Sequence, residues 1–230
     1  MVQRTPTQPD TSDMVVVHRV FRREFRLLPQ MVRAVPSGDT ARARVVAAHC
    51  AEMVEALHHH HGGEDDLVWP LLRERAALQA PLVERMEQQH EVVASLLEQA
   101  VDLTGRWAAD PRAGYGDALV EVLTQVSAAL DEHLDEEERT VLPLVAQHLT
   151  VKEWGQLAER GMTSMPRNRL VVFLAHVLED ASAEERRAFL GHVPLPGRLA
   201  YRLVGRRTHR REVQALRRDL PTPPGCAVTP

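Results

Sequence analysis

Apolar residues recur at helical spacing in four long segments before residue 150. In the first segment, from about residue 13 to 35, Val17, Phe21, Leu28 and Val32 fall on one side of a helix. This spacing is typical of an amphipathic helix that turns one face toward a core. A Pro-Ser-Gly run at residues 36–38 ends the segment.

Three further segments have the same character. The second begins near Asp39, whose short polar side chain suits a helix N-cap, and fades near residue 77. Pro81 opens the third, which ends before turn signals at residues 110–116, and the fourth spans about residues 117–149. Four long helices joined by short turns predict an all-α fold, an up-down-up-down four-helix bundle over residues 13–149.

A different region follows the bundle, and we expect residues 150–220 to form a helical C-terminal extension. Thr150 with Glu153, and Ser182 with Glu185, have the spacing of capping boxes that start shorter helices. A third helix is predicted over residues 198–218, which contain eight Arg. Residues 1–12 and 221–230 are expected to be flexible tails. The apolar stripe predicted for the third helix comprises Leu199, Leu203, Val213 and Leu216.

The charge is divided unevenly between these two regions. Residues 1–150 carry a net charge of −10 and residues 151–230 a net charge of +6. We therefore expect the basic extension to pack on the acidic bundle, and this interpretation is favoured over nucleic-acid binding. No apolar run approaches the roughly 20 residues that cross a bilayer. The polar N-terminus lacks a signal-peptide core, so a cytoplasmic protein without a membrane partner is expected.

Composition narrows the fold and the function. Aromatic residues make up only 4% of the chain, Gly numbers 12, and β-branched residues do not alternate with polar ones, which argues against a sandwich, barrel or propeller. The sequence has no phosphate-cradling Gly-rich loop and no nucleophile triad. Phosphoryl transfer and triad hydrolysis are therefore unsupported.

A pattern of possible metal ligands occurs twice in the chain. On the second and fourth predicted helices, a His is followed by Glu four residues later and by Pro six residues after that. A single His also precedes each of these pairs by 42 or 43 residues, on the first and third helices. The two copies consist of His18, His60, Glu64 and Pro70, and of His90, His133, Glu137 and Pro143.

This repeat predicts a metal pair inside the bundle. Residues four apart on a helix point to nearly the same side, so each His-Glu pair presents an imidazole and a carboxylate to one point. Carboxylates buried without partners are too costly to keep, and a mixed set of imidazoles and carboxylates in a bundle is typical of di-iron or di-manganese sites. Zinc is less favoured. We predict two Fe ions bridged by Glu64, Glu137 and an oxo or hydroxo group, with His18, His60, His90 and His133 as terminal ligands.

These residues, and the segments HHHHGGEDDLVWPLL and DEHLDEEERTVLPLV around them, resemble the hemerythrin-like (HHE cation-binding) family over about residues 13–149. The resemblance implies a di-iron bundle in which the same six residues are ligands. The oxygen-carrying hemerythrins also have a second His on the third helix, spaced H-x-x-x-H, and end with H-x-x-x-x-D. Here Met86 and Ala94 flank His90 at four residues, and Glu138 stands where those carriers have Asp.

One metal is therefore short of a nitrogen relative to the oxygen carriers. Glu87 and Glu138 are the first candidates for a replacement ligand, with His61 behind them. The departure argues against reversible oxygen transport and toward the looser members of the family, which are associated with iron, oxygen or nitric oxide sensing and with peroxide chemistry. We expect a protein that binds or senses O2, NO, peroxide or iron itself. The alternatives are a catalase-like, peroxide-consuming enzyme and a redox- or metal-responsive module that acts through the Arg-rich extension.

Overall fold

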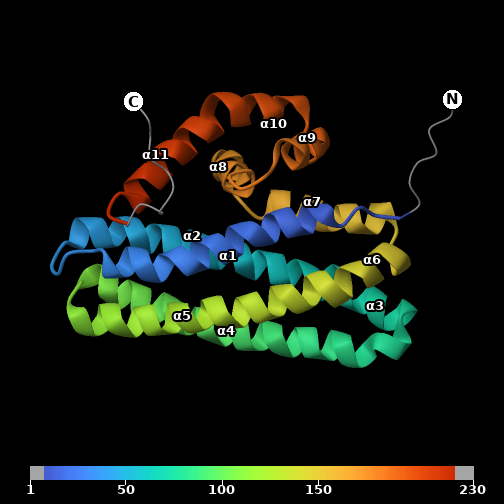
Figure 1. The fold of residues 1–230 in the computed structure, drawn as a ribbon, viewed down its shortest axis with the longest axis horizontal. Coiled ribbons are helices and arrows are strands. Elements are labelled where there is room, and N and C mark those ends of the chain that lie inside the picture. Colours follow the sequence, from blue (N-terminus) through green and yellow to red (C-terminus); the bar gives the residue numbers. More distant parts are fainter. Residues whose placement is uncertain (1–7, 221–230) are drawn as a thin grey trace.

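The computed structural model describes residues 8–220, and all regular elements among them are helical. The predicted tail at 221–230 and the first seven residues lie outside the described residues. Four long antiparallel helices make the bundle, with α1 and α2 on one side and α4 and α5 on the other (Figure 1). The predicted all-α bundle is confirmed. Its helices are α1 (Ser12–Arg33), α2 (Thr40–Leu67), α4 (Ala80–Ala109) and α5 (Ala113–Glu136).

The second and fourth helices were predicted to run without a break to about residues 77 and 149. In the structure both are interrupted before these residues. The first break comes at Val68, one turn after Glu64, and the second begins at Glu137 itself; Pro70 and Pro143 lie in the first turn of the next helix. Because proline has no N–H for the i−4 carbonyl, the helical ladder cannot run through it. The elements after the breaks are α3 (Trp69–Arg75), η1 (Ala77–Gln79), the π-helical turn η2 (Glu137–Val141) and α6 (Leu142–His148).

Six further elements make up the extension. Both predicted capping boxes are present, at Thr150 with Glu153 and at Ser182 with Glu185. The helix expected over 198–218 begins earlier and contains a π-helical turn, and α8 was not predicted. The elements are α7 (Val151–Thr163), α8 (Arg167–Val177), α9 (Ala183–His192), α10 (Leu195–Ala200), η3 (Tyr201–Gly205) and α11 (Arg206–Arg217).

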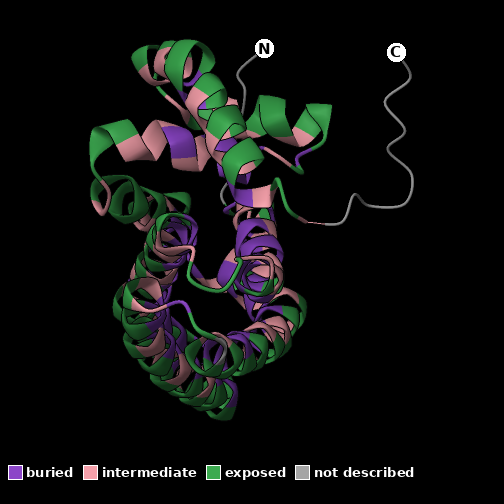
Figure 2. Cartoon of the chain, turned by 90° about the vertical axis from the view of Figure 1, so that its left-hand side faces the viewer, coloured by how far each residue is buried: buried purple, intermediate pink, exposed green. Residues whose placement is uncertain are grey.

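Buried residues lie along the inner sides of the bundle helices (Figure 2), and their apolar side chains form two clusters. The larger cluster contains Phe21 and Leu57 and fills most of the bundle, whereas the smaller one contains Trp69 and Met86 and closes the end near α3 and α6. Val17, predicted to face inward, is only half-buried, because the inner face of α1 passes through Val16 and Val20 instead. Among the described helices, none has the length and hydrophobicity to span a membrane.

The extension contacts the α1 and α2 side of the bundle (Figure 1). Each of the two regions supplies both arginines and acids to the ion pairs between them. Arg169 of α8 binds Glu52 of α2 at 2.6 Å, and Arg19 of α1 binds Glu185 of α9 at 2.6 Å. Among the described residues, Arg217 is the one arginine of the Arg-rich stretch that pairs with a bundle acid. The electrostatic attraction between the extension and the bundle therefore comes from a few specific ion pairs. The division into domains at residues 149 and 150 stays a prediction.

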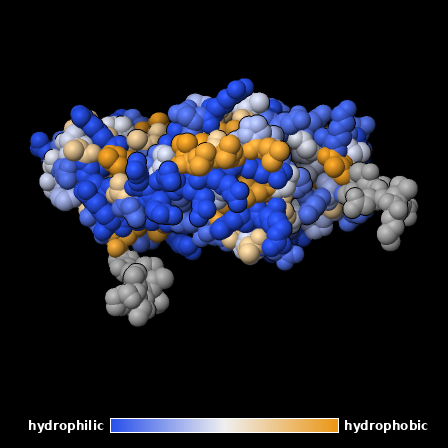
Figure 3. All heavy atoms as spheres, turned by 90° about the horizontal axis from the view of Figure 1, so that it is seen from above, coloured by the Kyte–Doolittle hydropathy of each residue, from blue (hydrophilic) through white to orange (hydrophobic). Residues whose placement is uncertain are grey.

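The apolar stripe predicted for the Arg-rich stretch is wrong in its first half. Leu199 and Leu203 are more than half exposed, and Figure 3, seen from the side of the extension, shows hydrophobic residues at this surface. Leu216 is buried as expected. The π-helical turn η3 lies between the two halves and changes the register, so that residues on either side of it no longer share one face.

Gly205 allows α8 and η3 to pack in close contact. A Cβ on this residue would lie 2.3 Å from the backbone oxygen of Val171, so the two elements would have to move apart. We expect Gly205→Ala to destabilise the protein by about 1–3 kcal/mol. Gly155→Ala in α7 is the matched control, because nothing lies within 4 Å of its added Cβ. Denaturant unfolding of both variants checks this; equal stabilities would contradict it.

Candidate metal centre

The six predicted ligands converge in one layer between the two apolar clusters. His18 comes from α1, His60 and Glu64 from α2, His90 from α4 and His133 from α5, while Glu137 is the first residue of the turn η2. All six are at least nine-tenths buried in their side chains. Segments that lie far apart along the chain thus bring their polar residues to one level of an otherwise apolar interior.

Donor atoms in this layer have separations typical of ligands that share a metal. Two donors held at about 2.1 Å from one ion lie about 3.0 Å apart at a right angle and about 3.4 Å apart at a tetrahedral angle. The corresponding distances here are 3.3 Å from His18 Nε2 to Glu137 Oε2, 3.2 Å from His60 Nε2 to Glu64 Oε1, 3.4 Å from His90 Nε2 to Glu64 Oε2 and 3.1 Å from His90 Nε2 to His133 Nε2.

Five inward-facing atoms of the six predicted ligands lack hydrogen-bond partners among the described residues. Both carboxylate oxygens of Glu64, Oε2 of Glu137, and the Nε2 atoms of His18 and His60 are buried and unpaired. An unpaired buried carboxylate is costly, and so many orphaned acceptors at one place are rarely kept without a cation. The residues present therefore fit a metal site by their chemistry as well as by their spacing.

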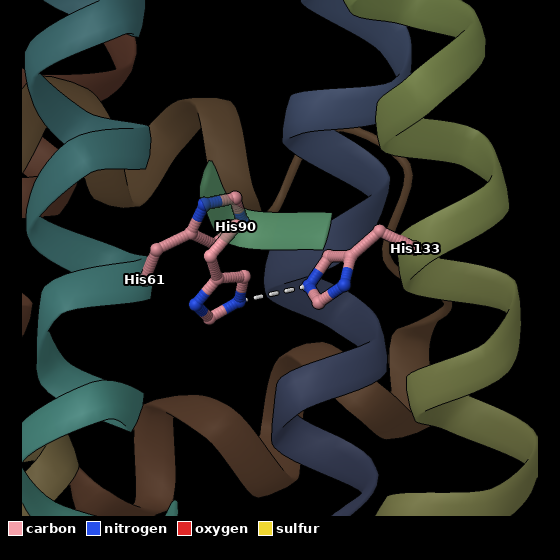
Figure 4. A group of neighbouring side chains, drawn as sticks. All are labelled: His61, His90 and His133. Atoms are coloured by element: carbon pink, nitrogen blue, oxygen red, sulfur yellow. Dashed lines mark hydrogen bonds between the residues drawn. The ribbon is translucent and has the colours of Figure 1, made fainter. Parts of the chain in front are cut away.

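His61 is a fifth imidazole of the layer, and sequence reasoning ranked it too low. Its ring stacks on His90 at 4.0 Å between centroids and lies 5.0 Å from His133, and Figure 4 shows the three side chains pointing toward one another. Its Nε2 is buried and unpaired. His60 reaches toward His18 on α1, at 5.2 Å between ring centroids. Because α2 packs against both α1 and α4, two consecutive residues can both be buried, His60 beside α1 and His61 beside α4.

The two carboxylates ranked ahead of His61 lie outside the layer. Glu87 is paired with Arg73 at the surface. Glu138 is partly exposed, where it accepts from Arg22 and contacts His18 Nδ1 at 2.9 Å. The prediction that these residues precede His61 as replacement ligands is not supported by their positions. The run of four consecutive histidines was the available sequence signal.

Outer hydrogen bonds fix the orientation of three of the rings. His18 Nδ1 contacts Glu138, His90 Nδ1 contacts Asp65 at 2.7 Å and His133 Nδ1 contacts Gln89 at 3.0 Å. Asp65 is itself held by the indole N–H of Trp69, at 2.9 Å. With Nδ1 engaged on the outside, Nε2 of each ring is directed inward, as is usual for metal-binding histidines with a partner on the other nitrogen.

Burial dominates the electrostatics of the layer. It lowers the pKa of His133 to about 2 and holds the pKa values of His60 and His61 well below the usual range. Burial also raises the pKa values of the Glu64 and Glu137 carboxyls. The neutral imidazoles are ready ligands, and the carboxyls release protons readily only when a cation takes their place.

The metal-free protein is expected to lose stability as pH rises from about 6.5 to 9. Burial lowers the pKa of His90, but the neighbouring Asp65 and Glu64 carboxylates outweigh it and raise the pKa to about 9. A raised folded-state pKa stabilises the protein below the unfolded value and ceases to do so above the folded one, and the raised carboxyl pKa values act in the same direction. Melting temperatures of chelator-treated protein across this range test the prediction. A metal-free protein that gains stability with pH would contradict it.

Comparisons with known proteins identify the family of this chain. The sequence model described as “Hemerythrin HHE cation binding domain” matches residues 10–145, which include all six predicted ligands. The chain is also similar to the zinc finger protein BRUTUS of Arabidopsis thaliana, with 21% identity over 168 residues. That match covers 73% of this chain but spans only 13% of the plant protein's length. No solved structure matches the chain significantly. Since the family model covers more than half of the chain, the protein belongs to the hemerythrin HHE cation-binding domain family, and it is a metal-binding protein of that family.

Proposed function

We propose that this chain holds two iron ions between Glu64 and Glu137 and uses them to bind or sense a small molecule of the O2, NO or peroxide class. The observation that carries the proposal is the position of Glu64. Its two oxygens are both buried and unpaired; one lies 3.2 Å from the imidazole of His60 on the same helix and the other 3.4 Å from the imidazole of His90 on α4. A carboxylate with one oxygen toward each of two imidazole groups is suited to bridge two cations.

The seven donors divide into two groups around that carboxylate. His18 and His60 lie with Glu64 on the α1 side, and the imidazoles of His61, His90 and His133 gather on the α4 and α5 side. Glu137 lies with Glu64 and His133, so it is the second bridging candidate. His61 supplies the nitrogen that the third helix lacks. Iron ions held in this way would supply the one-electron chemistry toward small oxygen and nitrogen ligands that protein side chains lack.

The surrounding residues control access to this centre. The Phe21 ring lies 5.1 Å from His60 and the Trp69 ring 5.7 Å from His90, measured between ring centroids. These apolar walls keep bulk water away from the centre and favour a small ligand over an organic substrate. Glu138, Asp65 and Gln89 keep three of the rings in place, so the donor set changes little when a ligand enters.

Metal analysis of freshly purified protein, with absorption spectra before and after O2, NO and peroxide, tests the proposal. We expect about two irons per chain and near-ultraviolet bands of a bridged iron pair that shift with one of these ligands. Oxygen evolution from peroxide, measured on the same samples, tests the catalase-like alternative. A protein that takes up zinc but no iron would contradict the proposal.

His61→Ala is expected to lower the iron content from two ions toward one, because three imidazoles serve the α4 and α5 side and the loss of one weakens that ion most. Losses of this kind typically reduce metal affinity by 10-fold or more. His59→Ala is the matched control, since the side chain of His59 is 39% exposed and lies two positions away on the same helix. Equal iron contents in the two variants would remove His61 from the donor set.

A further inference from the structure

A second group of metal-ligand residues lies in the extension, where it meets the bundle. His176 belongs to α8, Glu179 follows directly after that helix, and His209 belongs to α11. One donor atom from each lies within 4.8 Å of the donors of the other two. We call these three residues the interface cluster. None of them was singled out by the repeated pattern, and none contributes to the centre in the bundle.

The two histidines of the interface cluster carry unsatisfied nitrogens. His176 is only 1% exposed, and neither of its ring nitrogens has a hydrogen-bond partner among the described residues. Nε2 of His209 is also buried and unpaired. The rings meet edge to face, with 4.4 Å between centroids. Buried polar atoms are normally satisfied, so orphaned nitrogens facing a carboxylate suggest that a cation belongs between them.

Distances and ionisation states both suit a cation. Nε2 of His209 lies 3.3 Å from Oε2 of Glu179, close to the separation of about 3.4 Å for two donors on one tetrahedral zinc ion. Burial lowers the pKa of the His176 ring, so it is a neutral imidazole near pH 7. Burial opposes ionisation of Glu179, but His209, Arg217 and Arg23 outweigh it and bring the pKa to about 2. A neutral imidazole and a carboxylate are the forms that bind metals.

Residues of the bundle hold the interface cluster from outside. Glu24 of α1 places Oε1 3.6 Å from Nδ1 of His176, which leaves Nε2 as the ring atom for a metal. Glu24 is fixed in turn by His49 at 3.0 Å and by Arg217 at 2.8 Å. Arg217 also binds both oxygens of Glu179, more closely Oε1 at 2.5 Å than Oε2 at 3.3 Å, and Arg23 lies 3.4 Å from Oε2. A carboxylate behind a ligating histidine, and a cation behind a ligating carboxylate, are the usual outer partners of metal ligands.

We propose that the interface cluster of His176, Glu179 and His209 is a second metal site, which binds a zinc-class divalent cation with water as the fourth ligand. Two imidazoles and one carboxylate form a three-residue set typical of zinc, and they lack the extra carboxylates that favour an iron pair. The cation would join α8 to α11 and, through Glu24, hold both against α1. Metal binding would therefore stabilise the packed position of the extension.

Zinc titration of iron-loaded protein tests this proposal. After equilibrium dialysis against micromolar ZnCl2, we expect the parent protein and His192→Ala to bind one zinc per chain more than His209→Ala. His192 is an exposed histidine of α9 and serves as the matched control. Iron is measured in the same samples, and the difference between parent and H209A is one zinc whatever occupies the bundle. Equal zinc contents in parent and H209A would overturn the proposal.

Thermal unfolding gives a second readout. A zinc concentration 100-fold above the dissociation constant is expected to raise the melting temperature of the parent by about 5–10 °C and to leave that of H209A unchanged. Should H209A lose helicity, Glu179→Gln replaces it, because this variant keeps the shape of the side chain and removes its charge. An equal rise in parent and E179Q would also overturn the proposal.

Discussion

Replacing Glu64 by alanine is expected to reduce the iron content from about two ions per chain to almost none. Both oxygens of this carboxylate face imidazoles, one toward His60 and the other toward His90, so one substitution removes a donor from each side of the centre. The remaining histidines belong to separate helices and lose the group that joins them. Metal analysis and the near-ultraviolet absorption of the purified variant provide the measurement.

The control for this variant is Glu55→Ala, which removes an exposed carboxylate from the same helix and should leave the iron content unchanged. Loss of the fold is a separate outcome that can be recognised. Without metal, E64A is expected to be at least as stable as the metal-free parent, because it no longer buries an unpaired carboxyl. Retention of two irons in E64A would contradict the proposed centre.

Replacing Glu24 by alanine is expected to destabilise the protein by about 3–5 kcal/mol, because it leaves buried cations without their partner. Glu24 is fully buried and binds Arg23 at 2.8 Å and Arg217 of the extension at 2.8 Å. Burial raises the pKa of this carboxyl, but His176, His49 and Arg23 hold it well below its ordinary value. The melting temperature should fall by roughly 10 °C.

Glu98→Ala is the control for this effect, since Glu98 is an exposed carboxylate in the middle of α4. Limited proteolysis adds a local readout. If Glu24 fastens the extension, E24A should be cut faster within residues 193–197, which join α9 to the first turn of α10, than either the parent or E98A. Unchanged melting and unchanged cleavage would show that the buried ion pairs contribute little net stability. The same pairs should weaken in acid, because a depressed carboxyl pKa stabilises the protein above its unfolded value and ceases to do so as pH falls.

The bundle and the six candidate ligands could be predicted from local spacing alone. An i, i+4 pair has one geometry on any helix, so His60 with Glu64 and His133 with Glu137 had to present their donors together once the helices formed. Because the same spacing of His, Glu and Pro occurs twice in the chain, chance does not account for the arrangement. The helix caps at Asp39, Thr150 and Ser182 were predictable for the same reason, because a cap depends on residues within one turn.

Helix interruptions were only partly predictable. Pro70 and Pro143 disfavour a continuous helical ladder, but the periodic pattern continues through both and predicts unbroken helices. The break in the second half takes the form of a π-helical turn that starts at Glu137 itself. Such a turn adds a residue to one helical repeat, and it is stabilised by packing around the site rather than by the propensities of its own residues.

Tertiary packing alone decided three features of this protein. His61 joins the layer because α2 packs against α4 as well as α1, an arrangement that no local spacing encodes. Leu199 and Leu203 remain exposed because the turn η3 changes the register of the Arg-rich stretch. The meeting of Glu24 with His176 joins residues 152 positions apart in the sequence. Residues within one helical turn fix each other's positions by backbone geometry, whereas contacts across the chain depend on the packing of many side chains at once. The sequence by itself therefore determined the bundle and its repeated donors, and only the folded chain determined the fifth imidazole and the interface cluster.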